Sequence, residues 1–150
     1  MDEAISLARA SVHEHKGGPV GAVIVCQNKL VGRGWNQVTR LFDPTAHAEM
    51  IAIREACRTL QRFDLRGCEI YTSCEPCPMC LAAIYWARLD RIFYACTRAD
   101  ACQIGFDDDF IYQQIPLEIA ARAIPMTQLS RDDARAVFQH WETKPDKLPY

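Results

Sequence analysis

Two short motifs, thirty residues apart, each place metal-binding side chains at the start of an expected helix. His47 is followed two residues later by Glu49, and Cys77 is followed three residues later by Cys80 in Pro-Cys-Pro-Met-Cys. At a helix start this spacing puts both sulfurs on one side of the first turn, where the helix N-terminus favours thiolates. One imidazole and two thiolates can hold one zinc ion. The fold must therefore bring these two helix starts together.

The spacing of apolar residues predicts alternating helices and strands along the whole chain. Strands joined by a tight turn are expected to form an antiparallel hairpin, and strands joined through a helix to lie parallel. The alternation predicts one α/β domain over residues 1–150, a three-layer α/β/α fold around a central mixed five-stranded sheet. The expected helices are 2–15, 46–61, 78–88, 107–114 and 130–142, and the expected strands are 20–26, 30–36, 68–73, 91–97 and 124–129.

Single residues affect two of these elements, the start of one helix and the stability of one strand. Asp43 or Thr45 is expected to cap the helix over 46–61, because both residue types accept hydrogen bonds from the first backbone N–H groups of a helix. Pro125 weakens the strand over 124–129, since proline has no N–H to donate to a neighbouring strand.

The composition is that of a soluble globular protein. Hydrophobic residues make up 49% and charged residues 24%, and the net charge is −2. This balance argues against nucleic acid as a partner. No apolar run reaches the ~18 residues of a membrane helix, and the N-terminus lacks the features of a signal peptide. We therefore expect a cytoplasmic protein that is not attached to a membrane.

The eight cysteines are expected to be free thiols or metal ligands. Disulfides are rare in a cytoplasmic protein, so metal binding or burial explains the cysteines better. Four of them lie in apolar strand-like or helical runs and are expected in the core. These four are Cys26, Cys57, Cys68 and Cys96.

His47, Cys77 and Cys80 suit a catalytic zinc site. Three protein ligands leave the fourth tetrahedral position to water, and zinc can lower the pKa of that water toward ~7. Glu49 is then the expected proton carrier. Residues i and i+2 of a regular helix do not face each other, which argues against Glu49 as a ligand beside His47.

The same residues have other interpretations. Cys74 precedes Cys77 by three positions, so Cys74 with the three candidate ligands could form a closed structural zinc site in a binding module without catalysis. Cys77 and Cys80 could form a redox pair at a helix start. Three cysteines at this spacing also match part of an iron–sulfur motif, but Ile84 stands where the fourth cysteine is expected. The carboxylate of Glu49 favours the open catalytic site.

His-x-Glu followed by Pro-Cys-x-x-Cys is the signature of zinc-dependent nucleobase deaminases. With these motifs and its order of elements, the chain resembles the cytidine deaminase superfamily. Within it, the likeness is to the small zinc-dependent bacterial guanine deaminases and covers nearly the whole chain. The matching stretches are 17–19, 21–25, 43–49, 71–80, 83–88, Gly105-Phe106-Asp107-Asp108 and the terminal Tyr150.

The resemblance implies a cytidine-deaminase-like fold and hydrolysis of guanine to xanthine and ammonia. One zinc ion per subunit would be held by His47, Cys77 and Cys80, with Glu49 moving protons and Asp108 assisting. It also implies a homodimer in which the segment of about 130–150 is exchanged, so that Tyr150 closes the partner's active site. The residues expected around the purine base are Asn36, His47, Ala48, Trp86, Asp108 and Tyr150.

Some of these roles have structural alternatives. Asn36 at a strand end could be a turn residue, Asp108 part of a solvated helix start, and Trp86 a core residue. A guanosine deaminase or a tRNA adenosine deaminase would share most of the motifs, although the second needs a basic surface.

The chain also departs from the family pattern at two places. Val20 stands where the family usually has phenylalanine, and Leu41-Phe42 replaces a more polar stretch. Phe42 could restore the aromatic surface that Val20 removes.

Overall fold

The computed structural model describes residues 1–106 and 108–149, and a single sheet lies at its centre. The strands are β1 (Gly21–Cys26), β2 (Lys29–Trp35), β3 (Cys68–Cys74) and β4 (Arg91–Cys96). The helices are α1 (Asp2–His13), α2 (Val38–Leu41), α3 (Ala48–Leu60), α4 (Pro78–Trp86), α5 (Arg98–Gln103), α6 (Asp108–Gln114), the 3-10 helix η1 (Ile119–Ala121) and α7 (Arg131–Thr143).

The chain divides into two compact units, Met1–Ile111 and Tyr112–Tyr150. The first unit holds the whole sheet with α1 to α5, and the second holds η1 and α7. Among the described residues, no helix is both long and apolar enough to span a membrane.

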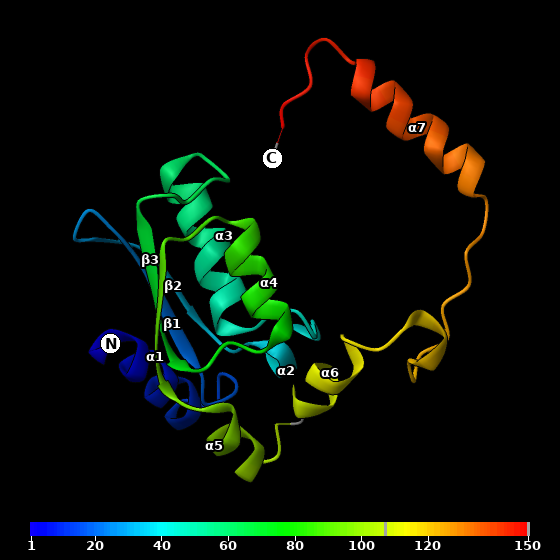
Figure 1. Cartoon of the computed structure of the whole chain (residues 1–150). Coiled ribbons are helices and arrows are strands. Elements are labelled where there is room, and N and C mark those ends of the chain that lie inside the picture. The colour runs from blue at the N-terminus through cyan, green and yellow to red at the C-terminus, as the bar shows by residue number, and fades with distance from the viewer. Residues whose placement is uncertain (107, 150) are drawn as a thin grey trace. The chain divides into compact units, whose positions relative to one another are not determined.

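The strands lie in the order β2-β1-β3-β4. β1 pairs antiparallel with β2 and with β3, whereas β3 and β4 are parallel and are connected through α4 (Figure 1). The expected hairpin and the expected parallel pair are both confirmed. The sheet is therefore mixed, as the alternation of elements predicts.

The sheet has four strands in the described part of the chain, so the expected fifth strand is wrong. Residues 124–129 form no strand and no helix. Pro125 has no N–H for a ladder, and three apolar side chains of this stretch, Ile124, Met126 and Leu129, are more than half exposed. A strand here would gain neither full backbone pairing nor burial of its apolar side chains.

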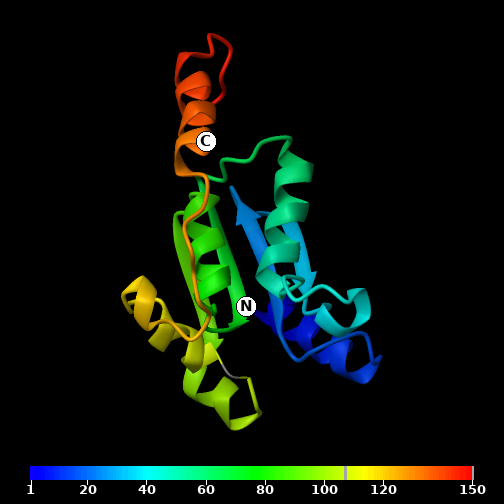
Figure 2. The same ribbon diagram turned by 90° about the vertical axis from the view of Figure 1, so that its right-hand side faces the viewer.

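Helices cover both faces of the sheet, with α1 on one side and α3 and α4 on the other (Figures 1 and 2). Glycine residues in the strands allow this close packing, because they have no side chain. A Cβ at Gly21 would lie 2.2 Å from the Ala4 carbonyl oxygen in α1, and one at Gly34 would lie 2.1 Å from the Ala48 carbonyl oxygen in α3. The small residues of α3 complete the contact, because Ala48, Ala52 and Ala56 are fully buried. Glycine in the strand thus fixes where α3 begins.

The core lies between the sheet and the α3–α4 layer. Its buried residues come from β1, β3, α3 and α4 and the loops that join them. Leu65, Ile70 and Ile84 are the largest apolar side chains of this cluster, with Ile24 of β1. The first turns of α3 and α4 are anchored on this core, and they carry the two motifs.

Candidate active site

The two motifs meet because His47 and Cys77 are the N-cap residues of α3 and α4. Both have extended backbone, with φ −70° and ψ 157° at His47 and φ −63° and ψ 167° at Cys77, and neither side chain caps its helix. The expectation that Asp43 or Thr45 caps α3 is therefore wrong. Those two residues bond each other instead, since the Thr45 backbone N–H and hydroxyl both donate to Asp43 Oδ1, at 2.8 and 2.7 Å.

The three candidate ligands lie together, as predicted. His47 Nδ1 lies 3.6 Å from Cys77 Sγ and 3.5 Å from Cys80 Sγ, and the three ligand atoms are within 4.8 Å of one another. Cys80 is fully buried. Cys77 begins α4, with Pro78 as its first helical residue, where the missing N–H of proline costs no hydrogen bond. One imidazole nitrogen and two cysteine sulfurs are a common set of ligands for zinc.

The electrostatics of the cluster also fit a cation. A hydrogen bond from Cys80, followed by one from His47, lowers the pKa of Cys77 to about 4. The same contact with Cys77, together with burial and the nearby Glu49, raises the pKa of Cys80 far above its usual range. The protein alone therefore holds only one of the two thiolates. A bound divalent cation would stabilise both, because it supplies the opposite charge that the second ionisation lacks.

Glu49 lies beside this cluster and is nearly fully buried, with 3% exposure. Its Oε1 accepts from the Thr72 hydroxyl at 3.3 Å, and its Oε2 accepts from Cys80 Sγ at 3.5 Å. Burial is the main cause of a raised pKa for this carboxyl. Because His47 lies outside the regular helix as its N-cap, the i, i+2 spacing does not prevent Glu49 from facing the same site.

Cys74 does not join the ligands. The cluster of ligand atoms in the described residues contains only His47, Cys77 and Cys80, and Cys74 Sγ instead faces the Thr97 carbonyl oxygen at 3.9 Å. Burial is the main cause that raises the pKa of Cys74 to about 11, so this thiol keeps its proton. A closed four-ligand site is therefore not formed in this structure, and the open three-ligand arrangement remains.

The cluster lies in the wall of a cavity of about 580 Å³ in the first unit. Asn36 lines it and is mostly buried. Two glycines make room for Asn36, since a Cβ on Gly17 would lie 1.8 Å from the Asn36 carbonyl oxygen and one on Gly18 would lie 3.1 Å from its Cγ. The Val38 N–H donates to Asn36 Oδ1 at 3.2 Å, which leaves the amide NH₂ to meet a ligand.

Asp108 reaches the same cavity from the start of α6. Its Oδ1 is buried and has no hydrogen-bond partner among the residues that the structure describes. Burial is the main cause of a raised pKa for this carboxyl. A buried acceptor without a partner is costly, so Asp108 suits a hydrogen-bond donor brought by a ligand.

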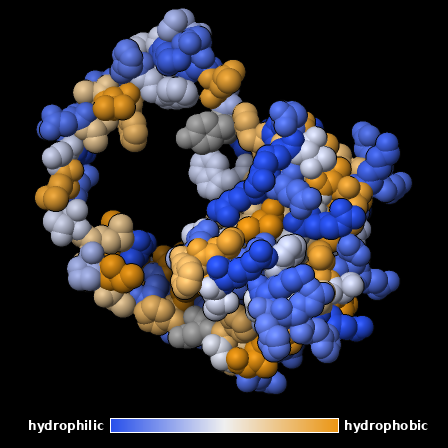
Figure 3. All heavy atoms as spheres, turned by 180° about the vertical axis from the view of Figure 1, so that it is seen from behind, coloured by the Kyte–Doolittle hydropathy of each residue, from blue (hydrophilic) through white to orange (hydrophobic). Residues whose placement is uncertain are grey.

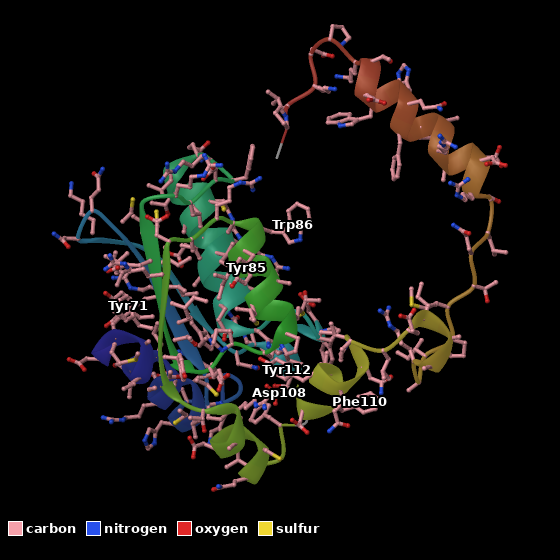
Figure 4. All side chains as sticks on the ribbon, in the orientation of Figure 1. Tyr71, Tyr85, Trp86, Asp108, Phe110 and Tyr112 are labelled. Atoms are coloured by element: carbon pink, nitrogen blue, oxygen red, sulfur yellow. The ribbon has the colours of Figure 1, made fainter. Side chains whose placement is uncertain are left out.

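Trp86 and Ala48 are placed differently from these residues. Trp86 ends α4, and its side chain is 65% exposed and points away from the helix, well apart from Asp108 (Figure 4). It lines a separate hollow with Ala82, Tyr85 and Arg88. Ala48 is fully buried as the first residue of α3 and can offer only its backbone. The predicted role of Tyr150 falls outside the described residues.

One wall of the cavity is not anticipated from the sequence. It includes Asp100, Ala101 and Gln103 from α5, followed by Ile104 and Phe106. The available signal is the pair Thr97 and Asp100, which form a capping box at the start of α5. Val20 lines the cavity, as the family position suggests, but Phe42 is 94% exposed and does not replace a missing aromatic wall.

A mixed α/β sheet with a His–Cys–Cys cluster at two helix N-termini defines a zinc-binding protein of the deaminase class. Residues 1–96 match the model of the cytidine and deoxycytidylate deaminase zinc-binding region. The chain belongs to this family.

Individual relatives extend the likeness beyond that region. Guanine deaminase of Bacillus subtilis is 47% identical over 150 residues, which cover 100% of this chain and 96% of the relative. An X-ray structure of guanine deaminase from Bacillus subtilis has a TM-score of 0.96 over 99% of this chain and 95% of its own. A structure of guanine deaminase from Nitrosomonas europaea is 30% identical, with a TM-score of 0.66 over 93% of this chain and 80% of its own. The tRNA-specific adenosine deaminase of Aquifex aeolicus is 47% identical over 77 residues, 51% of each chain.

Proposed function

We propose that the protein is a zinc-dependent guanine deaminase that converts guanine and water to xanthine and ammonia. The observation that carries the proposal is one cavity whose wall includes His47 and Cys77 of the three-ligand cluster, the carboxyl of Glu49, and two polar residues for a base, Asn36 and Asp108. The full-length similarity to guanine deaminase of Bacillus subtilis supports guanine as the substrate.

His47, Cys77 and Cys80 would hold the zinc ion. When bound, zinc acts as a Lewis acid that activates water for attack on the ring carbon bearing the amino group. Glu49 holds and moves the protons. Its carboxyl takes a proton from the attacking water, delivers it to a ring nitrogen, and serves again when the amino group leaves as ammonia. The burial of Glu49 keeps this proton away from bulk solvent.

Asn36 and Asp108 offer complementary groups to a purine. The free amide NH₂ of Asn36 can donate to a purine acceptor, and Asp108 Oδ1 can accept from a ring N–H or from the amino group. In contact with the amino group, the carboxyl of Asp108 assists the proton transfer that Glu49 carries out. Ala48 offers its backbone N–H as the first residue of α3, where no intrahelical acceptor is available.

The charges of the cavity favour a free base over a nucleotide. Four carboxylate residues line it, namely Glu49, Glu75, Asp100 and Asp108, and no lysine or arginine does so in the described part of the chain. Such a wall repels phosphate. The similarity to tRNA-specific adenosine deaminases covers 51% to 64% of this chain, whereas the similarity to guanine deaminase of Bacillus subtilis covers all of it. Both observations disfavour tRNA as the substrate.

The second unit supports an additional proposal, that the segment of about 130–150 is exchanged with a second copy in a homodimer. Within this unit, apolar side chains lie exposed among polar ones (Figure 3). Val137, Phe138 and Trp141 of α7 are 66%, 75% and 45% exposed. An isolated helix with such a face is marginally stable until the face is covered. In the exchanged dimer, Tyr150 would complete the partner's active site.

Side-by-side assays of guanine, guanosine, adenine and cytosine test the substrate, and Glu49→Gln tests the mechanism. We expect the zinc-loaded protein to form equal amounts of xanthine and ammonia from guanine. Glu49→Gln should fold and keep zinc while kcat falls by ~10²–10⁴-fold, as for loss of a general acid/base. Glu55→Gln, on the same helix, is the matched control and should keep kcat. Turnover of another substrate in place of guanine would contradict the assignment.

A further inference from the structure

Thr72 is a polar residue on the face of the sheet that packs in the core. Along β3, the side chains of Cys68, Ile70 and Thr72 alternate onto the same face, toward α3 and α4. All three residues are essentially inaccessible to solvent, with exposures of 1%, 0% and 0%. A buried hydroxyl is unfavourable unless it forms a hydrogen bond. The position therefore requires an explanation beyond core packing.

The partner of this hydroxyl is the carboxyl of Glu49. Thr72 Oγ1 donates to Glu49 Oε1 at 3.3 Å, while Cys80 Sγ lies 3.5 Å from Oε2. Two different elements, β3 and α4, thus hold the two oxygens of a carboxyl that belongs to α3. Oε1 is directed at the sheet, and Oε2 is directed at the candidate metal ligands.

The two contacts come from different kinds of residue. Cys80 is one of the three candidate metal ligands, whereas Thr72 is not. The hydroxyl of Thr72 is also the shorter of the two side-chain contacts to Glu49 that the structure describes. Thr72 is therefore the side chain outside the ligand cluster that fixes the Glu49 carboxyl.

We infer that Thr72 is a positioning residue, whose hydroxyl holds Glu49 with Oε2 toward the metal ligands and the cavity. The inference rests on the proposed function, because it assigns Thr72 to the step in which Glu49 moves protons. Thr72 itself touches neither the cavity nor the candidate ligands in the described structure, so it acts through Glu49.

Three variants separate this role from packing. Thr72→Val keeps the shape of the side chain and removes the hydroxyl, Thr72→Ser keeps the hydroxyl and removes a methyl group, and Ile70→Val trims the same face of β3 two residues earlier. We expect Thr72→Val to lower kcat for guanine by about 10-fold, equivalent to one hydrogen bond of about 1.4 kcal/mol. KM and one zinc per chain should be unchanged. Thr72→Ser and Ile70→Val should keep kcat within about 3-fold of the wild type.

A crystal structure of zinc-loaded Thr72→Val supplies a readout independent of activity, and it should show the Glu49 carboxyl turned from its wild-type position. The inference is overturned if Thr72→Val keeps the wild-type kcat and Glu49 position, if Thr72→Ser loses as much as Thr72→Val, or if the loss follows loss of zinc. If the wild type does not turn over guanine, the proposed function fails by itself. The same variants are then compared on the substrate that the wild type accepts, with the same criteria.

Discussion

At the scale of single residues, the candidate site brings together the ionisable side chains of Cys77, Cys80 and Glu49, with Cys80 in contact with both of the others. Cys77 ionises readily, with a pKa of about 4, whereas contact with Cys77 raises the pKa of Cys80 and burial raises that of Glu49. Without a cation, Cys77 is ionised while Cys80 and Glu49 tend to keep their protons. A divalent cation would favour the thiolate of Cys80 as well, and Glu49 would remain available to exchange protons.

The residue that most directly separates an open site from a closed one is Cys74. We predict that Cys74→Ala retains one zinc per chain, because its thiol faces Thr97 and lies outside the ligand cluster. Cys80→Ala should lose zinc, because it removes one of three ligands. Metal content after gel filtration, measured by mass spectrometry of the metal, checks both. Loss of zinc from Cys74→Ala would restore the closed-site interpretation.

At the scale of elements, the site depends on where α3 and α4 begin. Both helices start with a ligand as N-cap, and their first turns are fixed by packing on the sheet rather than by side-chain caps. Gly34 sets the start of α3, because any side chain there would overlap the backbone of Ala48 and Ala52. The position of His47 is therefore determined by a residue on the neighbouring strand.

Gly34→Ala tests this dependence. The added Cβ would lie 2.1 Å from the Ala48 carbonyl oxygen, so α3 must shift. We expect the free energy of unfolding to fall by about 1–3 kcal/mol, as in overpacked cores, and zinc affinity to fall with it. Chemical denaturation and competition with a zinc chelator measure the two effects. Arg33→Ala, at the exposed neighbouring position, should change neither by more than about 1 kcal/mol. An unchanged zinc affinity in Gly34→Ala would show that close packing on Gly34 does not determine the position of α3 and His47.

The sequence predicts the elements that carry the motifs because their apolar periodicity is strong. α3, β3, α4 and β4 fall where expected, and so does the ligand set. The sequence does not predict features that depend on tertiary contacts, such as the N-cap of α3 and the absence of a strand over 124–129. His47 is not among the preferred N-cap types, so its place as cap of α3 is not evident from local sequence. A fifth strand over 124–129 would need a neighbouring strand to pair with and a surface to bury its apolar side chains. The local pattern of apolar residues does not show whether either is present.

At the scale of the whole molecule, the chain divides into one unit that contains the candidate site and one whose apolar side chains are largely exposed. The first unit contains the ligands, Glu49, Asn36 and Asp108. The second contains the segment proposed to exchange between two copies. The proposed active site is then complete only in the dimer, where Tyr150 comes from the partner.

Complementation between two inactive variants tests the exchange. We predict that the full chain has twice the mass of its 17.0 kDa protomer in light scattering. Glu49→Gln and Tyr150→Ala homodimers should each have low activity. When the two are co-expressed with different tags and purified as mixed dimers, activity should return, because the Tyr150→Ala protomer keeps Glu49 and receives Tyr150 from its partner. Mixed dimers as inactive as both parents would contradict the exchange.

Deamination of guanine by this chain is proposed to depend on a zinc site of His47, Cys77 and Cys80. The most direct measurement is guanine turnover by chelated protein as zinc is added back, with xanthine, ammonia and bound zinc determined in the same samples. We expect negligible turnover without metal and a linear recovery that ends at one zinc per chain. Full guanine turnover by metal-free protein, or none by protein that holds one zinc per chain, would contradict the proposal.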